Sequence, residues 1–524
     1  MPTFKLDGRE ISFEPGETVI QAAWRVGIEI PHYCWHPGLS IAANCRMCLV
    51  HVTSGRQMAL PQLELDEERG EYVPTTKPKL DPACQLAAAE DMEVSSTSEV
   101  VKTAQASVQE FLLLNHPVDC PICDQSGECK LQDYYYEHQG TLKRKLTEPV
   151  HKPKGVRFGP TIVYDAERCI MCTRCIRVCD ELAKDHVLDM RERGDRMEII
   201  LAPGRELDHK YTLMTEHVCP VGALTSSDFR FKARVWFLKS GAGVCTGCAT
   251  GCNTHVDYDP RYGKVYRLRP RDNEDVNKFW MCDDGMMTYT RHDTDRLLMP
   301  TAGRGEERTP VLDDEAFALA AEQLRNVEAS KLAVVLSAQH TTEDNLALVK
   351  LAQALGAGQL YLAALGGWEG DDILRSDDNN PNRAGAIQAA GGAPLKTVAD
   401  LLTDVQSGAV QGVLALGWAT AEKLEELAPL VTLDAVVSLT THVGALPAVA
   451  SVAIPVADTF EIEGSFVNEK GMAQAFKPVL HPPAGVEPGW KAIAALAGQL
   501  GHDLGFKDIQ ALREGLAIEV EAAQ

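Results

Sequence analysis

The chain has 524 residues, of which 45% are hydrophobic and 24% charged, an ordinary composition for a globular protein of several domains. Its 74 acidic residues outnumber its 51 basic residues, and the net charge of −23 argues against nucleic acid or an anionic lipid surface as the main partner, while it suits docking of a more basic subunit. The N-terminal sequence MPTFKLDGRE lacks the basic and apolar regions of a secretory signal, so we expect reduced cysteines rather than a disulfide framework.

Residues 1–90 have the pattern of a small β-rich domain. Asp7-Gly8 is a hairpin turn signal between two short apolar runs, and a helical apolar periodicity follows Pro15-Gly16. We therefore predict a helix over 19–26 and strands at Phe4–Leu6, Ile11–Phe13 and Met47–Val52. The charged segment 54–79 contains Pro and Gly and is predicted to be a surface excursion.

Beyond residue 90 we predict three further modules with their own cysteines, at 91–150, 151–235 and 236–300. Ser95–Ser98 is an N-cap signal, and the helix predicted over Glu99–Leu114 leads directly to His116.

Residues 301–524 contain no cysteine and are rich in alanine. Strand patterns alternate there with helical ones, which predicts a parallel α/β sheet with strands at Leu332–Ser337, Leu360–Ala364, Gly412–Leu416 and Ala435–Leu439. Thr341 or Thr342 should begin a helix that ends at Leu355, with Gly356 after it. Histidine and proline interrupt the apolar stretch 435–457, which we interpret as two buried strands with a turn rather than a membrane span. Neither a G-x-G-x-x-G after a strand nor a P-loop is present, so no NAD site is expected.

Fifteen of the 16 cysteines, together with His116, form four sets with the spacing of metal ligands. The first set is Cys34, Cys45, Cys48 and Cys84, and the second is His116, Cys120, Cys123 and Cys129. The third set is Cys169, Cys172, Cys175 and Cys219, and the fourth is Cys245, Cys248, Cys252 and Cys282. Short gaps let one loop provide two or three ligands. Four such sets indicate a protein that carries electrons through iron–sulfur clusters.

Each cluster needs four ligands, and three cysteines leave one position open in the second set, so His116 is predicted to fill it. Zinc also takes four thiolates and is the alternative metal. The ten-residue gap of the first set does not resemble a zinc ribbon, the third set has the bacterial ferredoxin pattern with Cys219-Pro220, and the fourth set is the least specific. Cys179 is predicted to be unligated and buried, because the second cluster that this position serves in two-cluster ferredoxins has no other cysteines here.

The first three sets, in this order and with the string LNHPVDCPICDQSGEC over 114–129, resemble the large iron–sulfur subunit (the G subunit) of bacterial NADH:quinone oxidoreductase, respiratory complex I. The resemblance covers about residues 1–300. It implies a β-grasp [2Fe–2S] ferredoxin domain, then His/Cys and ferredoxin-like [4Fe–4S] modules, and it makes the fourth set an extra [4Fe–4S] site that only some members keep. One [2Fe–2S] and three [4Fe–4S] clusters are thus expected.

The resemblance also implies partners and a location. Electrons should arrive from a flavin/NADH-binding subunit and leave toward quinone-side iron–sulfur subunits of a proton-translocating enzyme. This chain should have no catalytic residue and no NADH or quinone site. It should lie peripherally on the cytoplasmic side of the inner (plasma) membrane, attached only through the complex. The position of the fourth cluster on or off the electron path stays open.

Residues 454–474 resemble the E-x-x-G-x-x-x-N-x-x-G-x-x-Q stretch of molybdopterin oxidoreductases. The expected fold class is therefore α+β and α/β multidomain, ending in a truncated α/β molybdopterin-oxidoreductase-like domain. Two departures argue against a molybdenum cofactor: Asp284 stands where that superfamily has lysine, and no cysteine follows Cys282. We expect a relic that serves packing and docking.

Three other functions share part of this pattern. An NAD-linked formate dehydrogenase has the N-terminal clusters, but the short C-terminal domain and Asp284 oppose it. An iron-only hydrogenase needs C-terminal cysteines, which this chain lacks. A non-catalytic zinc-binding scaffold is the third alternative, and it would be colourless.

Overall fold

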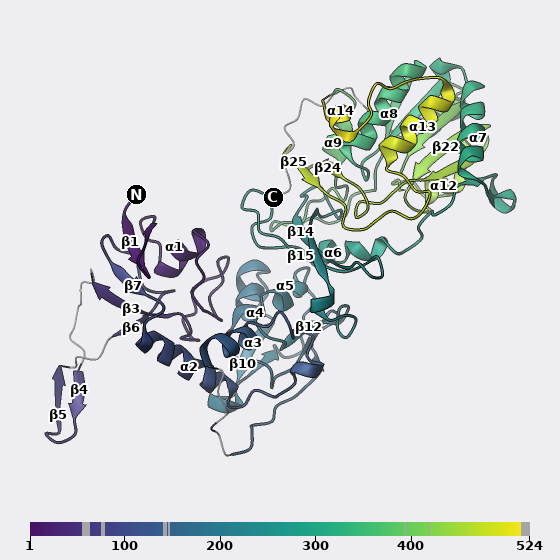
Figure 1. Cartoon of the computed structure of the whole chain (residues 1–524). Coiled ribbons are helices and arrows are strands. Elements are labelled where there is room, and N and C mark those ends of the chain that lie inside the picture. Colours follow the sequence, from purple (N-terminus) through teal and green to yellow (C-terminus); the bar gives the residue numbers. More distant parts are fainter. Residues whose placement is uncertain are drawn as a thin grey trace. The chain divides into compact units, whose positions relative to one another are not determined.

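The computed structural model describes residues 1–54, 63–74, 79–139, 144, 147–392, 395–417 and 419–514. Its contacts divide the chain into two units, Met1–Phe237 and Leu238–Gln524 (Figure 1).

The first unit begins with the predicted hairpin, in which β1 (Thr3–Leu6) pairs antiparallel with β2 (Arg9–Ser12). Asp7 and Gly8 both have positive φ, 48° and 80°, as the tightest hairpin turn requires. Together with β7 (Glu93–Ser95), β3 (Leu49–Ser54) and β6 (Leu80–Pro82) they form a five-stranded sheet in the order β2-β1-β7-β3-β6. The predicted helix is present as α1 (Val19–Arg25), and its apolar face shares one core with the strands and with the buried Cys48 and Cys84.

The predicted excursion contains an antiparallel pair, β4 (Leu63–Asp66) and β5 (Glu71–Pro74). Its other parts, 55–62 and 75–78, lie outside the described residues.

The rest of the first unit consists of short elements that support long loops. Two small sheets occur: β12 (Leu224–Ser226), β9 (Ile162–Tyr164) and β8 (Val156–Arg157) form one, and β10 (Leu188–Arg191) with β11 (Glu198–Leu201) forms the other. The predicted helix after Ser98 is α2 (Glu99–Leu113). The other helical segments are α3 (Lys130–Tyr134), α4 (Arg174–Arg177), α5 (Thr212–His217), η1 (Cys120–Ile122), η2 (Tyr135–Gln139), η3 (Val178–Leu182), η4 (Gly194–Arg196) and η5 (Val235–Phe237).

The second unit opens with an antiparallel sheet of β13 (Lys239–Val244), β14 (Asn253–Asp259) and β15 (Lys264–Pro270). The short helices α6 (Asp283–Met286) and η6 (Thr288–Arg291) follow it. An eight-stranded sheet then forms in the order β17-β16-β23-β22-β21-β18-β19-β20, and all the pairs from β23 to β20 are parallel, as the alternating pattern predicted. Its strands are β16 (Thr301–Ala302), β17 (Thr309–Pro310), β18 (Leu332–Ser337), β19 (Gln359–Ala363), β20 (Lys396–Thr397), β21 (Gly412–Leu416), β22 (Ala435–Thr440) and β23 (Val452–Pro455).

Helices cover both faces of this sheet. Successive residues of β18 point to opposite faces, and because both sets of side chains are apolar, each face has to be covered. Val334 and Leu336 pack with α7 (Asp313–Arg325), α8 (Thr342–Leu355) and α13 (Gly489–Leu500), whereas Ala333 and Val335 pack with α10 (Val398–Gln406). Burial of each such valine or leucine contributes about 1.5–3 kcal/mol, so the sheet is the main core of this unit. The remaining elements are α9 (Arg383–Ala389), α11 (Ala428–Val431), α12 (Ala445–Val449), α14 (Ile509–Arg513), η7 (Gly305–Glu307), η8 (Ala329–Lys331), β24 (Gly464–Val467) and β25 (Ala473–Phe476).

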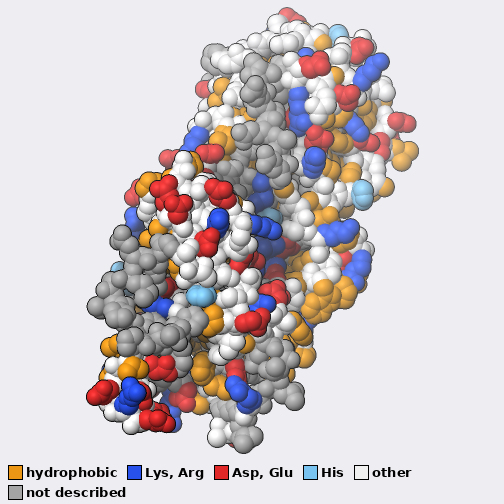
Figure 2. Space-filling view, turned by 60° about the vertical axis from the view of Figure 1, so that its left-hand side comes forward, with side chains coloured by type: hydrophobic (Ala, Val, Ile, Leu, Met, Phe, Trp, Pro, Cys, Tyr) orange, Lys and Arg blue, Asp and Glu red, His pale blue; other side chains and the backbone are white. Residues whose placement is uncertain are grey.

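Helix α8 has the predicted ends: Thr341 accepts a hydrogen bond from the Asp344 amide at 3.0 Å, and Gly356 is left-handed with φ 67°. The stretch 435–457 forms two buried strands, but α12 rather than a simple turn connects them. Among the described residues, no helix combines the length and apolarity needed to cross a bilayer. Acidic and basic side chains are interspersed on the face shown in Figure 2.

Candidate iron–sulfur sites

The first set lies where the loop after α1 meets Ala83 and Cys84, the two residues that follow β6. The Cys34 amide donates to Sγ of Cys45 at 3.5 Å, and the Ala83 amide donates to the Cys48 carbonyl at 2.8 Å, which brings Cys84 beside Cys48. The hydrogen bond with Cys45 lowers the pKa of Cys34 to about 5, and the one with Cys48 lowers the pKa of Cys84. The same contacts, together with burial, raise the pKa of Cys45 and of Cys48 well above its usual value. The four thiols therefore form one neighbourhood in which each stabilised thiolate is paired with a protonated thiol.

The second set surrounds η1 and the start of α3. Cys120 is exposed, Cys123 is buried, and Cys129 caps the N-terminus of α3. Burial raises the pKa of Cys129 to about 12, and the nearby thiols of Cys123 and Cys120 add to this rise.

His116 follows α2 and shares the neighbour Arg168 with Cys123. Burial lowers the pKa of His116 to about 4, so its imidazole is neutral at pH 7, the form that binds metals. Its buried Nδ1 has no hydrogen-bond partner among the described residues. This histidine thus has the protonation state and the available nitrogen that a ligand needs.

The third set encloses a small apolar cavity. All four of its cysteines line this cavity with Tyr164 and Ile199. The ligand loop turns tightly through two left-handed residues, Met171 (φ 54°) and Thr173 (φ 61°), before α4 begins. Burial raises the pKa of Cys175 well above its usual value, and the other three thiols add to this effect. Because several thiolates are unfavourable together in such a site without a cation, this donor set fits an iron–sulfur cluster.

Cys179 does not line that cavity. It is buried in η3, and its Sγ lies 3.5 Å from Nε2 of His209. Burial raises its pKa to about 12, as expected of a small apolar thiol.

The fourth set is entirely buried in the second unit. A Cβ placed on Gly285 would lie 3.2 Å from Sγ of Cys245 and 3.3 Å from Sγ of Cys282, so both sulfurs face the same glycine of α6. Burial raises the pKa of Cys252 well above its usual value, and the nearby thiols of Cys245, Cys248 and Cys282 add to this rise. Asp284, next to this set, pairs at 3.2 Å with Arg375, which stacks on Trp368 at 3.9 Å.

All 16 cysteines are free of disulfides. Within the described part of the chain, no group of three or more His, Cys, Asp or Glu side chains converges closely enough to hold a single metal ion.

Contacts within the first unit place the third set next to both the first and the second. Arg177 donates to the carbonyls of Cys34 and Cys172 at 2.6 and 3.2 Å. On the other side, the Lys130 amide donates to the Pro220 carbonyl at 3.1 Å. A Cβ on Gly222 would lie only 2.2 Å from Sγ of Cys123, so the chain after Cys219 passes directly against a second-set ligand.

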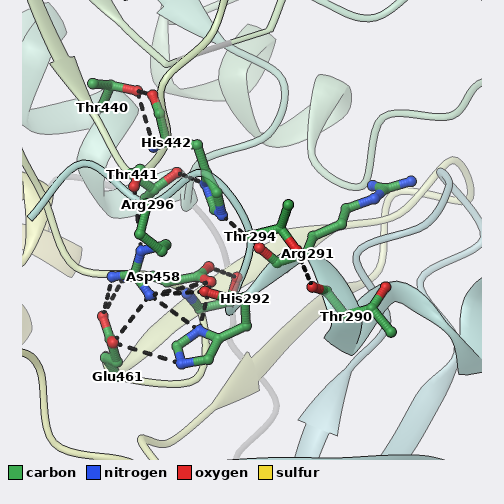
Figure 3. Close-up of polar contacts among 11 residues, drawn as sticks. Thr290, Arg291, His292, Thr294, Arg296, Thr440, Thr441, His442, Asp458 and Glu461 are labelled. Atoms are coloured by element: carbon green, nitrogen blue, oxygen red, sulfur yellow. Dashed lines mark hydrogen bonds and ion pairs between the residues drawn. The ribbon is translucent and has the colours of Figure 1, made fainter.

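The C-terminal stretch that resembles molybdopterin oxidoreductases contacts the loop of the fourth set. Gln474 donates to the Gly251 carbonyl at 2.8 Å, and Asn468 donates to the Thr250 carbonyl at 3.4 Å. Glu461 forms a bidentate pair with Arg296 at 2.8 and 3.1 Å (Figure 3). These polar side chains therefore connect the last cysteine module to the α/β sheet.

A cavity of about 50 Å³ lies beside this network, lined by Thr246, Thr288, His292, His340, Thr441 and Asp458. Although burial opposes it, the 2.8 Å hydrogen bond from His292 lowers the pKa of Asp458 well below its usual range (Figure 3). A wider depression of about 620 Å³ has four acidic side chains in its wall, those of Asp371, Asp372, Asp377 and Glu469, and two basic ones, those of Arg375 and Lys470.

Sequence spacing did not reveal the contacts of four residues with distant loops. Arg168 donates to Asp119, Arg174 to Trp35 and Arg177 to Cys34, and Gly222 lies against Cys123, all more than 40 residues away in the chain. The available signal was the position of the three arginines beside ligands, Arg168 directly before Cys169 and Arg174 and Arg177 on either side of Cys175.

Known families match three regions of the chain. A 2Fe-2S iron-sulfur cluster binding domain matches residues 1–99, an NADH-ubiquinone oxidoreductase-G iron-sulfur binding region matches 105–141, and the ferredoxin-like domain of NADH-quinone oxidoreductase subunit 3 matches 159–225.

Curated relatives agree with these matches. The NADH-quinone oxidoreductase G subunit of Rickettsia felis is 34% identical over 357 residues, 68% of this chain and 50% of the relative. NADH-quinone oxidoreductase subunit 3 of Thermus thermophilus is 33% identical over 378 residues, 68% of this chain and 46% of the relative. A solved NAD+-reducing [NiFe]-hydrogenase aligns at a TM-score of 0.36 and 29% identity over 45% of this chain and 91% of its own. The chain spans about half the length of the curated relatives it matches. By its matched iron–sulfur regions and these relatives, the chain belongs to the family of the NADH-quinone oxidoreductase G subunit, also named subunit 3.

Proposed function

We propose that this chain is the electron-relay iron–sulfur subunit of an NADH-quinone oxidoreductase. It takes electrons from a flavin/NADH-binding subunit and passes them toward quinone-side iron–sulfur subunits. The first set would bind a [2Fe–2S] cluster and each of the other three a [4Fe–4S] cluster. The clusters provide one-electron carriers, and the chain's own residues bind them, bury them and fix their spacing.

The contacts of the third set carry this proposal. Arg177 bonds carbonyls of the first and third sets, and Gly222 and Pro220 lie against the second set. Three redox sites in contact within one unit would form a continuous path for electrons. A non-catalytic metal-binding scaffold would not need its metal sites to lie in contact. We infer the order first, third, second.

The surface near the second set supports an exit there. Cys120 is exposed, and beside it Val118 and Ile122 are 93% and 59% exposed. Apolar side chains exposed beside an exposed ligand would be covered if another protein docked there. The next electron carrier would dock at this site, and the chain would be held peripherally at the cytoplasmic side of the inner membrane through the complex.

Residues 301–524 are proposed to be a truncated molybdopterin-oxidoreductase-like domain without molybdenum. The 50 Å³ cavity is far below the roughly 300–1,000 Å³ of ordinary cofactor pockets. The wider depression has four carboxylates against two cations, Arg375 and Lys470, and this excess of negative charge disfavours an anionic phosphate-bearing ligand. Its motif residues instead hold the fourth-set loop, so we assign that cluster a structural role.

Replacement of a central ligand tests the relay. Cys172→Ala, studied in the assembled complex, should abolish NADH-to-quinone electron transfer while NADH-to-ferricyanide activity, which needs only the flavin end, largely persists. Cys179→Ala is the matched control, because Cys179 lies outside the third-set cavity, and it should keep both activities. Normal quinone reduction in a complex that lacks the third cluster's EPR signal would contradict the proposal.

A further inference from the structure

Two arginines of α4 connect the loops of the first and third sets. The Arg177 guanidinium donates to the carbonyls of Ser40, Cys34 and Cys172 at 2.5, 2.6 and 3.2 Å. Arg174 donates to the carbonyl of Val218, which precedes the ligand Cys219, at 3.1 Å, and also to the carbonyl of Trp35. We call Arg174 and Arg177 the arginine pair.

The arginine pair has no carboxylate partner among the described residues. Every hydrogen bond that its guanidinium groups make goes to a backbone carbonyl, and both Nε atoms are buried without a partner in the described chain. Arg177 is only 8% exposed. A buried cation without a counter-ion is strongly unfavourable, so the surroundings must provide negative charge.

Anionic clusters held by the neighbouring ligands can provide that charge. Arg177 donates to the carbonyls of one ligand of each set, Cys34 and Cys172. Arg174 lies between Cys172 and Cys175 in the chain and donates to the carbonyl next to the ligand Cys219. Each arginine thus lies within electrostatic range of a ligand, and the pair faces both sets.

We propose that Arg174 and Arg177 are positioning residues that hold the ligand loops of the first and third sets together and place positive charge between them, which favours the reduced state of the clusters at both sites. Reduction adds one negative charge to a cluster that is already anionic with its thiolates. A fixed cation a few ångströms away stabilises that added charge, and it does so more strongly in a buried site than in water. The inference rests on the proposed assignment of clusters to these two sets.

The test is a dye-mediated redox titration of the full chain, reconstituted anaerobically with iron and sulfide and followed by low-temperature EPR. The two signals are assigned by their loss in Cys34→Ala and Cys172→Ala. Arg177→Gln keeps a hydrogen-bonding amide but removes the charge. At a fixed ambient potential it should lower the reduced-to-oxidised ratio of both clusters about tenfold, equivalent to about 59 mV for one electron. Arg177→Lys keeps the charge and should stay near the wild-type ratio.

Two further variants complete the design. Arg191→Gln removes an arginine that is 56% exposed and paired with Glu198, and it should leave both ratios unchanged. Arg174→Gln repeats the charge removal in case Arg177→Gln does not fold, and it should shift both ratios in the same direction.

The outcomes separate the inference from the function on which it rests. Ratios in both glutamine variants within twofold of wild type, with both signals present, would overturn the inference alone. A shift in Arg177→Lys as large as that in Arg177→Gln would overturn it too, because charge would not be the cause. Absence of both signals from the wild-type chain would overturn the assigned clusters and the inference together.

Discussion

Gly222 offers a steric test of the contact between the third and second sets. An added Cβ would lie 2.2 Å from Sγ of Cys123, about 1.5 Å short of an ordinary contact distance of roughly 3.5–4.0 Å. The backbone on both sides is held, since Asp165 donates to the Ala223 carbonyl at 2.7 Å and Lys130 donates to the Pro220 carbonyl at 3.1 Å. Cys123 therefore has to move by more than the roughly 0.2 Å tolerance of a metal–ligand distance.

We expect Gly222→Ala to remove the second cluster, lowering iron by about four atoms per chain. The free energy of unfolding of the chain should fall by about 1–3 kcal/mol, the usual effect of overpacking a core. Iron analysis, EPR and urea unfolding measure these quantities. Gly498→Ala is the control, because nothing lies within 4 Å of its added Cβ and helix α13 favours alanine by roughly 0.5–1 kcal/mol. Full iron content and unchanged unfolding in Gly222→Ala would refute the contact.

Three more predictions concern single sites. His116→Ala should perturb only the second cluster's EPR signal and reduce NADH-to-quinone transfer while NADH-to-ferricyanide activity persists, because the other three sets are complete without it. Changing Cys248 and Cys252 to Ala should lower stability or assembled yield but leave quinone reduction per assembled complex near normal, because metal binding at that site adds to folding free energy. Burial lowers the pKa of His340 from 6.5 to about 4, so the free energy of unfolding should fall as pH drops from 6.5 toward 4, where only the unfolded chain binds the proton. Over that range urea unfolding should show the wild type losing about 3 kcal/mol more of this free energy than His340→Asn.

Each of these has a contrary result. Unchanged EPR and quinone reduction in His116→Ala would show that His116 is not a ligand. A large loss of quinone reduction per assembled complex in the Cys248 and Cys252 variant, with the other signals intact, would place the fourth cluster on the electron path. Parallel pH curves for wild type and His340→Asn would show that this imidazole is not buried neutral.

Local signals in the sequence predicted much of this fold. The Asp7-Gly8 hairpin, the helix after Ser98 and the strand Leu332–Ser337 all follow from turn chemistry, capping and apolar runs, which act over a few residues. Helix α12 was not predicted, because proline and histidine at 442–455 indicate a break but not what fills it. Its conformation depends on packing against β22.

In the candidate sites, too, the sequence predicted the local features but not the contacts between distant loops. Ligand spacing grouped the cysteines because neighbouring ligands on one loop are close in sequence. It did not reveal that Arg177 bonds Cys34, 143 residues earlier, or that Gly222 lies against Cys123, since such contacts depend on how separate loops pack. That the third set lies against both the first and the second is therefore information that only the folded chain provides.

The most direct measurement of the central claim is metal analysis with low-temperature EPR on the reduced, anaerobically prepared chain. We expect about 14 iron atoms per chain, two from one binuclear cluster and twelve from three tetranuclear clusters, with visible absorption that dithionite bleaches. A colourless chain with stoichiometric zinc and no EPR signal on reduction would contradict the electron-relay function.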